Sequence, residues 1–452
     1  MSPRAHLAGP VVVLLGVLLG VVLVAGCTTP AGSAAAGAGV SSTPTTATAP
    51  ATPTAVAPDP AAGRAAAVTD LLERWAAALR RGDADAVAGL ADPRADPAFV
   101  AAERARAAAL AGVPLTDLGY RIGTDPTPVV DPALVRSLAA DEVWAPPVEL
   151  RYALAGADDR PTTRPVGLVV ARRGSTWALV SDTAVADRGR TTWRGPWDFG
   201  PVITRPGAQG GLVVGHLAQA DAVALLGDQL DTAVGAVADF WGGGFDGAVA
   251  VWVPGSAAER TALVGSTVDP AGAAVSTADA VDRAAGTATG QRITLDPAVL
   301  DRLTPAAAGV LLRHELSHAA TRAVTSEGAP RWLLEGVAQH VGYRGTGTTV
   351  AAGAPTVAAL TVANGPPDQL PDDLQLSTGP GVGIAYELAW TFAEFVADTR
   401  GEDVLRALHA AVGVLVTPTE AELDTALRPV LGVGAAQARA QWGAWLAEQV
   451  RR

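Results

Sequence analysis

The sequence contains one cysteine, Cys27, and no lysine. With a single cysteine the chain cannot form an internal disulfide, so the burial of apolar side chains must hold its folded parts together. The chain has 452 residues, which exceeds the usual size of one domain. Two folded units with additional segments are therefore expected.

Positive charge is scarce and is nowhere concentrated. Every basic side chain except histidine is an arginine, and the formal net charge is -12. A protein that binds nucleic acid generally needs a basic face to replace the counterions of the phosphates. The sequence has no run of basic residues, so no nucleic-acid partner is expected.

Long apolar runs are absent apart from one at the N-terminus. Arg4 precedes an apolar run over residues 11–23, and the small residues 24–26 precede Cys27. This order resembles the signal and lipobox of bacterial lipoproteins. The resemblance implies removal of a signal peptide, residues 1–26, and a lipid on Cys27 that anchors the chain to the extracytoplasmic face of the cell membrane. An uncleaved membrane anchor and an ordinary secretory signal with an incidental cysteine stay open as alternatives.

The next segment, residues 27–62, is almost wholly Ala, Thr, Pro, Ser, Gly and Val, and its first charge is Asp59. Such a composition cannot bury enough apolar surface to offset the entropy lost on ordering. The sequence therefore predicts a disordered tether between the lipid and the folded units.

The first folded unit is expected over residues 63–188. Apolar residues recur at helical spacing from Val68 to Leu79, and strands are expected over 148–154, 165–172 and 176–182. Helices followed by an antiparallel sheet resemble the cone-like fold of nuclear-transport-factor-like proteins. The resemblance implies a pocket or surface that binds a partner or a small ligand.

Residues 189–211 contain many Gly and Pro and are expected to form a connector to a second unit, residues 212–452. In this unit strands and helices alternate before a helical half, which makes the whole chain α+β. Residues 344–383 carry many Gly, Pro and Asp and predict a mobile loop beside a cleft. The strands are expected over residues 212–215, 248–253, 274–276 and 292–295, and the helices over 221–241, 257–263, 384–395, 404–412 and 435–450, with a further helix that begins at Pro305 after an N-cap at Thr304.

The pentad HELSH at residues 314–318 carries the strongest chemical signal. A random chain of this composition would contain HExxH about 0.003 times. Residues four apart lie one above the other on a helix, so His314 and His318 can direct ring nitrogens at one metal ion. After a break at Gly328, Glu335 on a second helix can supply a third ligand.

The residues around Glu335 extend the signal. The pattern WLxEGxA over residues 332–338, together with HELSH, resembles the two ligand-bearing helices of the gluzincin metallopeptidases, the clan that includes thermolysin and the zinc aminopeptidases. The resemblance covers residues 290–345 well and the rest of the C-terminal half loosely. It implies one Zn²⁺ ion per chain, bound by His314, His318 and Glu335, within a thermolysin-like domain.

The same resemblance assigns the chemistry. It implies that Glu315 acts as general base and acid while water attacks the amide of a peptide or protein substrate. Gluzincins also use a Tyr or His to stabilise the oxyanion, and Tyr386 is the candidate by position, with helix packing as the alternative. Gly336 and Ala338 are small, which predicts a close approach of the glutamate helix to the metal helix.

The remaining candidates have simpler structural interpretations. Tyr343 ends the glutamate helix and is expected to cap the core, although it is a second candidate for the oxyanion. His340 lies five residues after Glu335 and so faces another side of the helix. His216 and His409 are isolated in the sequence and are expected to be structural.

Two other functions stay open. The chain can be a surface lipoprotein whose peptidase-like domain is inactive and serves as a binding module, or an enzyme for a non-peptide amide. The sequence lacks a GxMEN exopeptidase motif, so endopeptidase and exopeptidase action are both possible. Strand 292–295 is expected at the edge of the sheet, where an extended peptide could pair with it.

Overall fold

The computed structural model describes residues 60–265, 272–377 and 379–452. The signal peptide, Cys27 and all but the end of the tether therefore lie outside the described residues. Within them, no helix combines the length and the apolar character needed to cross a membrane.

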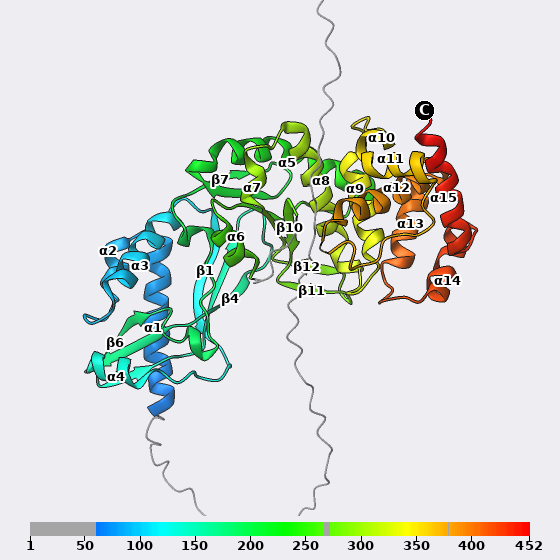
Figure 1. Cartoon of the computed structure of the whole chain (residues 1–452). Coiled ribbons are helices and arrows are strands. Elements are labelled where there is room, and N and C mark those ends of the chain that lie inside the picture. The colour runs from blue at the N-terminus through cyan, green and yellow to red at the C-terminus, as the bar shows by residue number, and fades with distance from the viewer. Residues whose placement is uncertain (1–59, 266–271, 378) are drawn as a thin grey trace, which may run out of the picture.

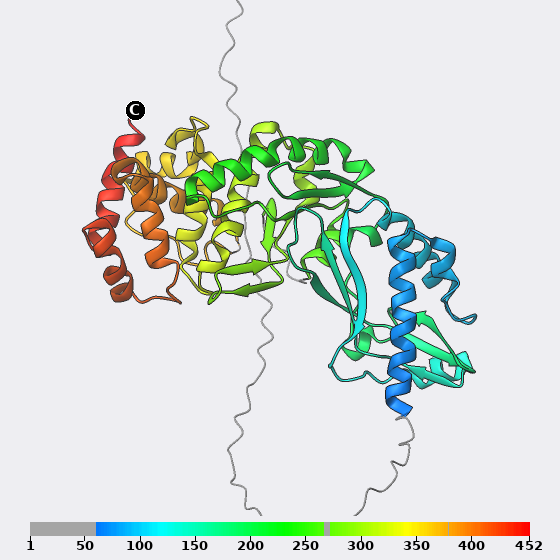
Figure 2. The same cartoon turned by 180° about the vertical axis from the view of Figure 1, so that it is seen from behind.

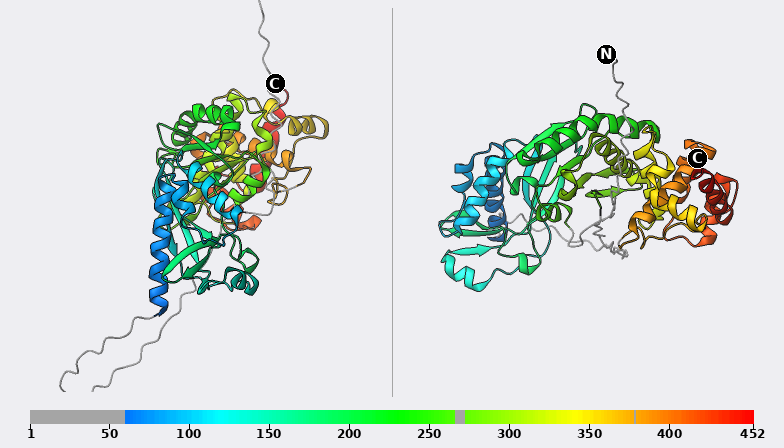
Figure 3. Two further views of the ribbon diagram at one scale, coloured as in Figure 1. Left: turned by 90° about the vertical axis from the view of Figure 1, so that its left-hand side faces the viewer. Right: turned by 45° about the horizontal axis from the view of Figure 1, so that its top comes forward.

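The chain is α+β, as expected. Figures 1 and 2 show helix α1 and its neighbouring strands at one end of an elongated molecule and helices α13 to α15 at the other, and the right-hand view of Figure 3 shows the same order. The N-terminal helices are α1 (Pro60–Arg80), α2 (Ala84–Ala88), α3 (Pro97–Leu110) and α4 (Pro132–Leu138). The N-terminal strands are β1 (Leu115–Ile122), β2 (Glu142–Trp144), β3 (Val148–Leu154), β4 (Thr162–Val166), β5 (Val169–Arg173) and β6 (Thr176–Ser181).

Helix α1 packs through the apolar face that its sequence predicts. Val68, Leu71, Leu72, Trp75 and Leu79 are all fully buried at helical spacing. The Trp75 ring stacks on a tyrosine of β1, with the ring centroids 4.0 Å apart. This contact joins the helix to the first strand of the sheet.

The N-terminal strands form two sheets, β1-β3-β4 and β2-β5-β6. The prediction of one strand over residues 165–172 was wrong, because β4 and β5 divide that segment between the two sheets. The break falls at Gly167, where any Cβ would collide with the carbonyl oxygen of Arg190. The close approach of another segment therefore ends the strand there.

A five-stranded mixed sheet lies at the centre, in the order β10-β13-β9-β8-β7. Its strands β8, β9 and β13 are parallel, and the two outer strands are antiparallel to their neighbours. The strands are β7 (Val202–Pro206), β8 (Leu212–His216), β9 (Ala250–Val253), β10 (Ala274–Thr277) and β13 (Arg292–Leu295), and β11 (Ala280–Asp282) and β12 (Thr287–Thr289) form a separate hairpin.

Two expectations about this sheet were wrong. Residues 292–295 form an interior strand, because β10 pairs with their outer side and so occupies the edge near the hairpin. Residues 202–206, expected within the connector, form the edge strand β7. In both cases a short segment pairs with a neighbouring strand of the sheet. The sequence of the segment does not show which strand it pairs with.

The central sheet buries both faces. Leu212, Val214 and Trp252 pack against the N-terminal unit, and Val213 and Val251 pack against the helices of the second unit. The alternation follows from the period of two in a strand. One continuous apolar core thus joins α1 to the central sheet.

A buried ion pair reinforces this junction. Arg292 of β13 donates two hydrogen bonds to Asp158 of the N-terminal unit, at 2.7 and 2.8 Å. The side chains of Arg292 and Asp158 are 3% and 0% exposed, and the guanidinium lies over the rings of Trp252 and Tyr152. The two units are therefore held by charge as well as by apolar contact.

The helices of the second unit surround the ligand-bearing helices α8 and α9. Part of the loop expected over residues 344–383 is helical, since α10 and α11 lie within it. Gly353 of α10 packs against the ring of Trp390, which fixes this segment on the core. The helices are α5 (Ala220–Trp241), α6 (Ala257–Val264), α7 (Pro297–Leu300), α8 (Pro305–Thr321), α9 (Arg331–Tyr343), α10 (Val350–Gly353), α11 (Pro355–Asn364), α12 (Val382–Arg400), α13 (Glu402–Val412), α14 (Glu420–Leu431) and α15 (Ala435–Gln449).

The buried ion pair yields a stability prediction. Asp158→Asn removes the carboxylate that bonds to the buried Arg292 and leaves only the longer-range attraction of Asp279, so the free energy of unfolding should fall by about 3–5 kcal/mol. Urea denaturation followed by circular dichroism measures the change. Asp159→Asn, at the adjacent exposed carboxylate, is the control and should change stability by less than about 0.5 kcal/mol. Equal effects of the two variants would contradict the role given to Asp158.

Candidate metal centre

Helix α8 positions the two histidines. Thr304 caps the helix by accepting a hydrogen bond from the amide of Ala307, and Pro305 occupies its first turn. The helix packs against α5 and against β10. His314 and His318 lie one turn apart on the same face of α8 and are 0% and 5% exposed.

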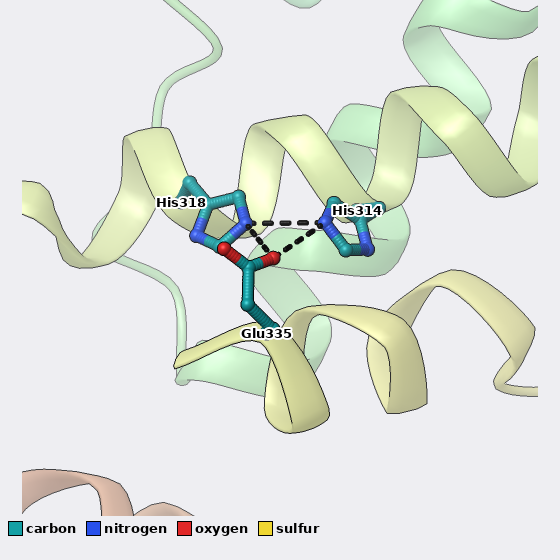
Figure 4. A group of neighbouring side chains, drawn as sticks. All are labelled: His314, His318 and Glu335. Carbon is teal, nitrogen blue, oxygen red and sulfur yellow. Dashed lines mark hydrogen bonds and ion pairs between the residues drawn. The ribbon is translucent and has the colours of Figure 1, made fainter. Parts of the chain in front are cut away.

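Helix α9 brings the glutamate to the same point. The chain turns back at Gly328, whose φ of +79° favours glycine, and α9 begins at Arg331. Figure 4 shows the Glu335 carboxylate reaching from α9 toward the two imidazoles on α8. Its side chain is 1% exposed.

The three ligand atoms face one another. Nε2 of His314 and Nε2 of His318 are 3.1 Å apart, and Oε2 of Glu335 lies 3.4 Å from each. The predicted ligands therefore form one buried cluster that could hold a metal ion. The structure thus brings together all three residues that the sequence predicts.

Unsatisfied polar atoms also favour a cation here. Oε2 of Glu335 and both carboxylate oxygens of Glu315 are buried without a hydrogen-bond partner. A buried polar atom without a partner costs about 1–3 kcal/mol, and a charged one costs more. A cation between His314, His318 and Glu335 would satisfy the free lone pairs of the ligand atoms.

The charges at the site act on each other. Burial raises the pKa of Glu335, but the nearby imidazoles of His318 and His314 outweigh burial and hold that pKa at about 2. Burial lowers the pKa of His318 below its usual value. Glu335 is therefore ionised at neutral pH, and His318 is available as a neutral ligand.

Glu315 lies next to the cluster on α8 and is fully buried. Burial raises the pKa of Glu315 to about 7, against the opposing influence of His314. A carboxyl group with this pKa can both accept and return a proton near neutral pH. Its burial and raised pKa are compatible with the role of general base that the sequence predicts, which stays a prediction.

Two glycines determine how closely α9 packs against α8 and α12. A Cβ at Gly336 would collide with the carbonyl oxygen of Ala389 on α12, and a Cβ at Gly342 would lie 3.1 Å from the carbonyl oxygen of Val310 on α8. The expectation that Gly336 faces the metal helix was therefore wrong, because it faces α12. Gly342 is the glycine that brings α9 close to α8.

The other histidines among the described residues, His216, His340 and His409, lie outside the cluster. His340 contacts Glu394 at 2.8 Å, and His216 bonds to Glu259 at 2.8 Å and to the carbonyl oxygen of Pro201 at 3.0 Å. His409 is buried against the ring of Trp241, and burial together with the nearby His318 lowers its pKa to about 4. These contacts fit the structural roles expected from the sequence.

The two tyrosine candidates lie on the helices around the site. Tyr386 is 8% exposed on α12, the helix that packs against α9. Its ring is part of the same apolar core as Trp332, and its part in catalysis stays a prediction. Tyr343 packs edge-on against Trp390, which fits a capping role at the end of α9.

A cavity of about 230 Å³ opens beside His318. Arg322, in the 3-10 turn Arg322–Val324 that follows α8, contributes to its wall. The sequence analysis did not single out Arg322. The sequence feature that could have indicated Arg322 is its position one turn after His318, at the end of a helix that is otherwise mostly apolar.

No model of a known protein family matches the chain, and no curated protein matches it. The chemistry of the site is therefore inferred from its own residues and their geometry.

The cluster predicts metal binding. The purified chain should bind about one Zn²⁺ ion. Loss of a residue that only hydrogen-bonds to a metal ligand typically weakens binding about 10- to 100-fold, and His318→Ala, which removes a ligand, should weaken zinc binding by more than that. Titration calorimetry and metal analysis measure the affinity and the stoichiometry. His216→Gln is the control, because His216 bonds to Glu259 away from the cluster. Equal affinity in the two variants would show that His318 is not a ligand.

The packing of Gly336 predicts a second effect. Gly336→Ala should destabilise the fold by about 1–3 kcal/mol, because the added methyl group forces α9 and α12 apart. It should also weaken zinc binding, since Glu335 moves with α9. Gly383→Ala on α12 is the control, because a Cβ there meets no atom within 4 Å. A normal melting temperature and zinc affinity for Gly336→Ala would contradict this account.

Proposed function

We propose that this chain is a gluzincin-type zinc metallopeptidase that hydrolyses peptide bonds outside the cytoplasm. The observation that carries the proposal is the buried cluster of two imidazoles and one carboxylate, with a second buried carboxylate, Glu315, beside it. Two histidines and one glutamate are the ligand set of catalytic zinc sites that leave a position open for water.

The spacing of the ligand atoms supports zinc. Ligand atoms about 2.0–2.1 Å from a tetrahedral zinc ion are separated by about 3.3–3.4 Å. The separations between His314, His318 and Glu335 are 3.1, 3.4 and 3.4 Å. The imidazole nitrogens also suit zinc better than magnesium or calcium, which prefer oxygen ligands.

The residues of the site divide the chemistry among them. Bound zinc supplies a Lewis acid that lowers the pKa of water toward about 7. The Glu315 carboxylate takes a proton from the attacking water and returns it to the nitrogen of the leaving amine.

The surrounding architecture supports the same family. A mixed sheet precedes the ligand-bearing helices, and a helical half follows them, as in the gluzincin plan. The N-terminal unit, with helices packed on antiparallel sheets, is proposed to be nuclear-transport-factor-like and to bind a partner or a small ligand. We further propose that lipid on Cys27 anchors the enzyme to the extracytoplasmic face of the membrane.

The proposal predicts loss of cleavage without loss of metal. Glu315→Gln cannot accept a proton, so cleavage of an unfolded protein substrate should fall by at least about 100-fold. Zinc content should be unchanged, because Glu315 is not a ligand. Mass spectrometry of the products and metal analysis measure the two effects.

Glu448→Gln, at an exposed carboxylate of α15, is the matched control and should cleave normally. Chelation should stop cleavage by the unchanged chain, and added zinc should restore it. Undiminished cleavage by Glu315→Gln would refute the assignment of the base. Zinc binding without cleavage of any peptide would favour the binding-module alternative.

A further inference from the structure

The cavity beside His318 is lined by residues from several segments of the chain. Val281 lies in β11, Arg283 lies in the turn between β11 and β12, Arg322 follows α8, and Leu334 immediately precedes Glu335 on α9. A group that enters this cavity therefore lies next to the metal centre. Most of the cavity wall is polar, with threonine, serine and charged side chains, and Val281 and Leu334 are its two large apolar side chains.

Arg322 is a buried cation with neutral partners. Its Nε donates to Oε1 of Gln291 at 3.2 Å, and its Nη2 donates to Oγ of Ser276 at 2.7 Å. The residue is 8% exposed. Burial lowers the pKa of Arg322 to about 10, against the opposing influence of Glu315, and the hydrogen bonds of its guanidinium within the described residues go to neutral side chains.

The third nitrogen of Arg322 is free to bind a ligand. Nη1 makes no hydrogen bond within the described parts of the chain, and it is not among the nitrogens sealed away from solvent. Arg322 is among the residues that line the cavity, and Nη1 is its one guanidinium nitrogen that is not bonded to Gln291 or Ser276. A buried charge is costly unless it is paired, so the cavity is built to receive an anion.

The other arginine of the cavity is already engaged. Arg283 donates from Nε to the carbonyl oxygen of Thr325 at 2.7 Å, and its Nη2 lies 3.6 Å from Oε1 of Glu327. Its side chain is 39% exposed, so solvent screens its charge. Arg283 therefore serves as a natural comparison for Arg322.

We propose that Arg322 binds a carboxylate of the substrate, so that the enzyme selects peptides with an acidic group next to the scissile bond. The inference rests on the proposed function and deepens it. A divalent ion and Arg322 together outweigh the two carboxylates Glu315 and Glu335, which leaves excess positive charge for an anionic substrate. The carboxylate belongs either to an Asp or Glu side chain or to a free C-terminus.

The first test compares matched peptides. Peptides that differ only by Glu or Gln beside the cleaved bond, and peptides with a free or an amidated C-terminus, separate the two sources of carboxylate. One of the two acidic forms should be cleaved with a kcat/KM about 10- to 100-fold higher than its neutral partner, the range of a hydrogen bond to a charged group. Equal kcat/KM values for all pairs would overturn the proposal.

The second test measures binding without turnover. Titration calorimetry with zinc-loaded Glu315→Gln should give the same preference for the acidic peptide. Adding Arg322→Gln should abolish the preference, while adding Arg283→Gln should retain it. Melting curves check that Arg322→Gln is folded, and Arg322→Lys, which keeps the charge, should retain part of the preference if the glutamine variant does not fold.

The outcomes separate this inference from the proposed function. Cleavage without an acidic preference overturns the role of Arg322 and keeps the peptidase. Acid-selective binding that depends on Arg322, without cleavage, keeps the carboxylate site and overturns the peptidase. If Arg322→Gln slows cleavage of acidic and neutral peptides equally and shifts the pH profile, Arg322 acts on Glu315 instead, and the proposal fails.

Discussion

The close packing of α9 between α8 and α12 is the constraint on which the buried cluster of His314, His318 and Glu335 depends. Gly342 admits the backbone of α8, and Gly336 admits the backbone of α12. With larger residues, α9 would lie farther from α8, and the Glu335 carboxylate would not reach the two imidazoles. The ligand geometry is therefore set by backbone contacts on both sides of one helix.

The rest of the fold makes that packing rigid. Helix α8 lies against α5 and the edge strand β10, and the central sheet is covered on its other face by the N-terminal unit. The Arg292–Asp158 pair fixes this unit to the sheet at a buried point. Because the chain has no disulfide, these apolar and ionic contacts hold a site of buried charges in place.

Much of the fold was readable from local patterns. The apolar spacing in α1 predicted that helix, the cap at Thr304 and Pro305 predicted the start of α8, and the hydrophobic segments of β3, β6 and β8 predicted these strands. Strand β7 and helices α10 and α11 were missed because their stability comes from a neighbouring strand or from Trp390. The Gly and Pro residues in and around these segments favoured a connector and a loop instead.

The sequence by itself determined the members of the metal cluster, since the spacing of His314 and His318 in a helix places both on one face. Only the tertiary structure decided that Arg322 is buried with neutral partners. Its environment comes from Ser276 and Gln291, which are distant in the chain. Whether a side chain is buried, and whether it has a countercharge, depends on which segments pack together. A local sequence pattern does not determine that packing.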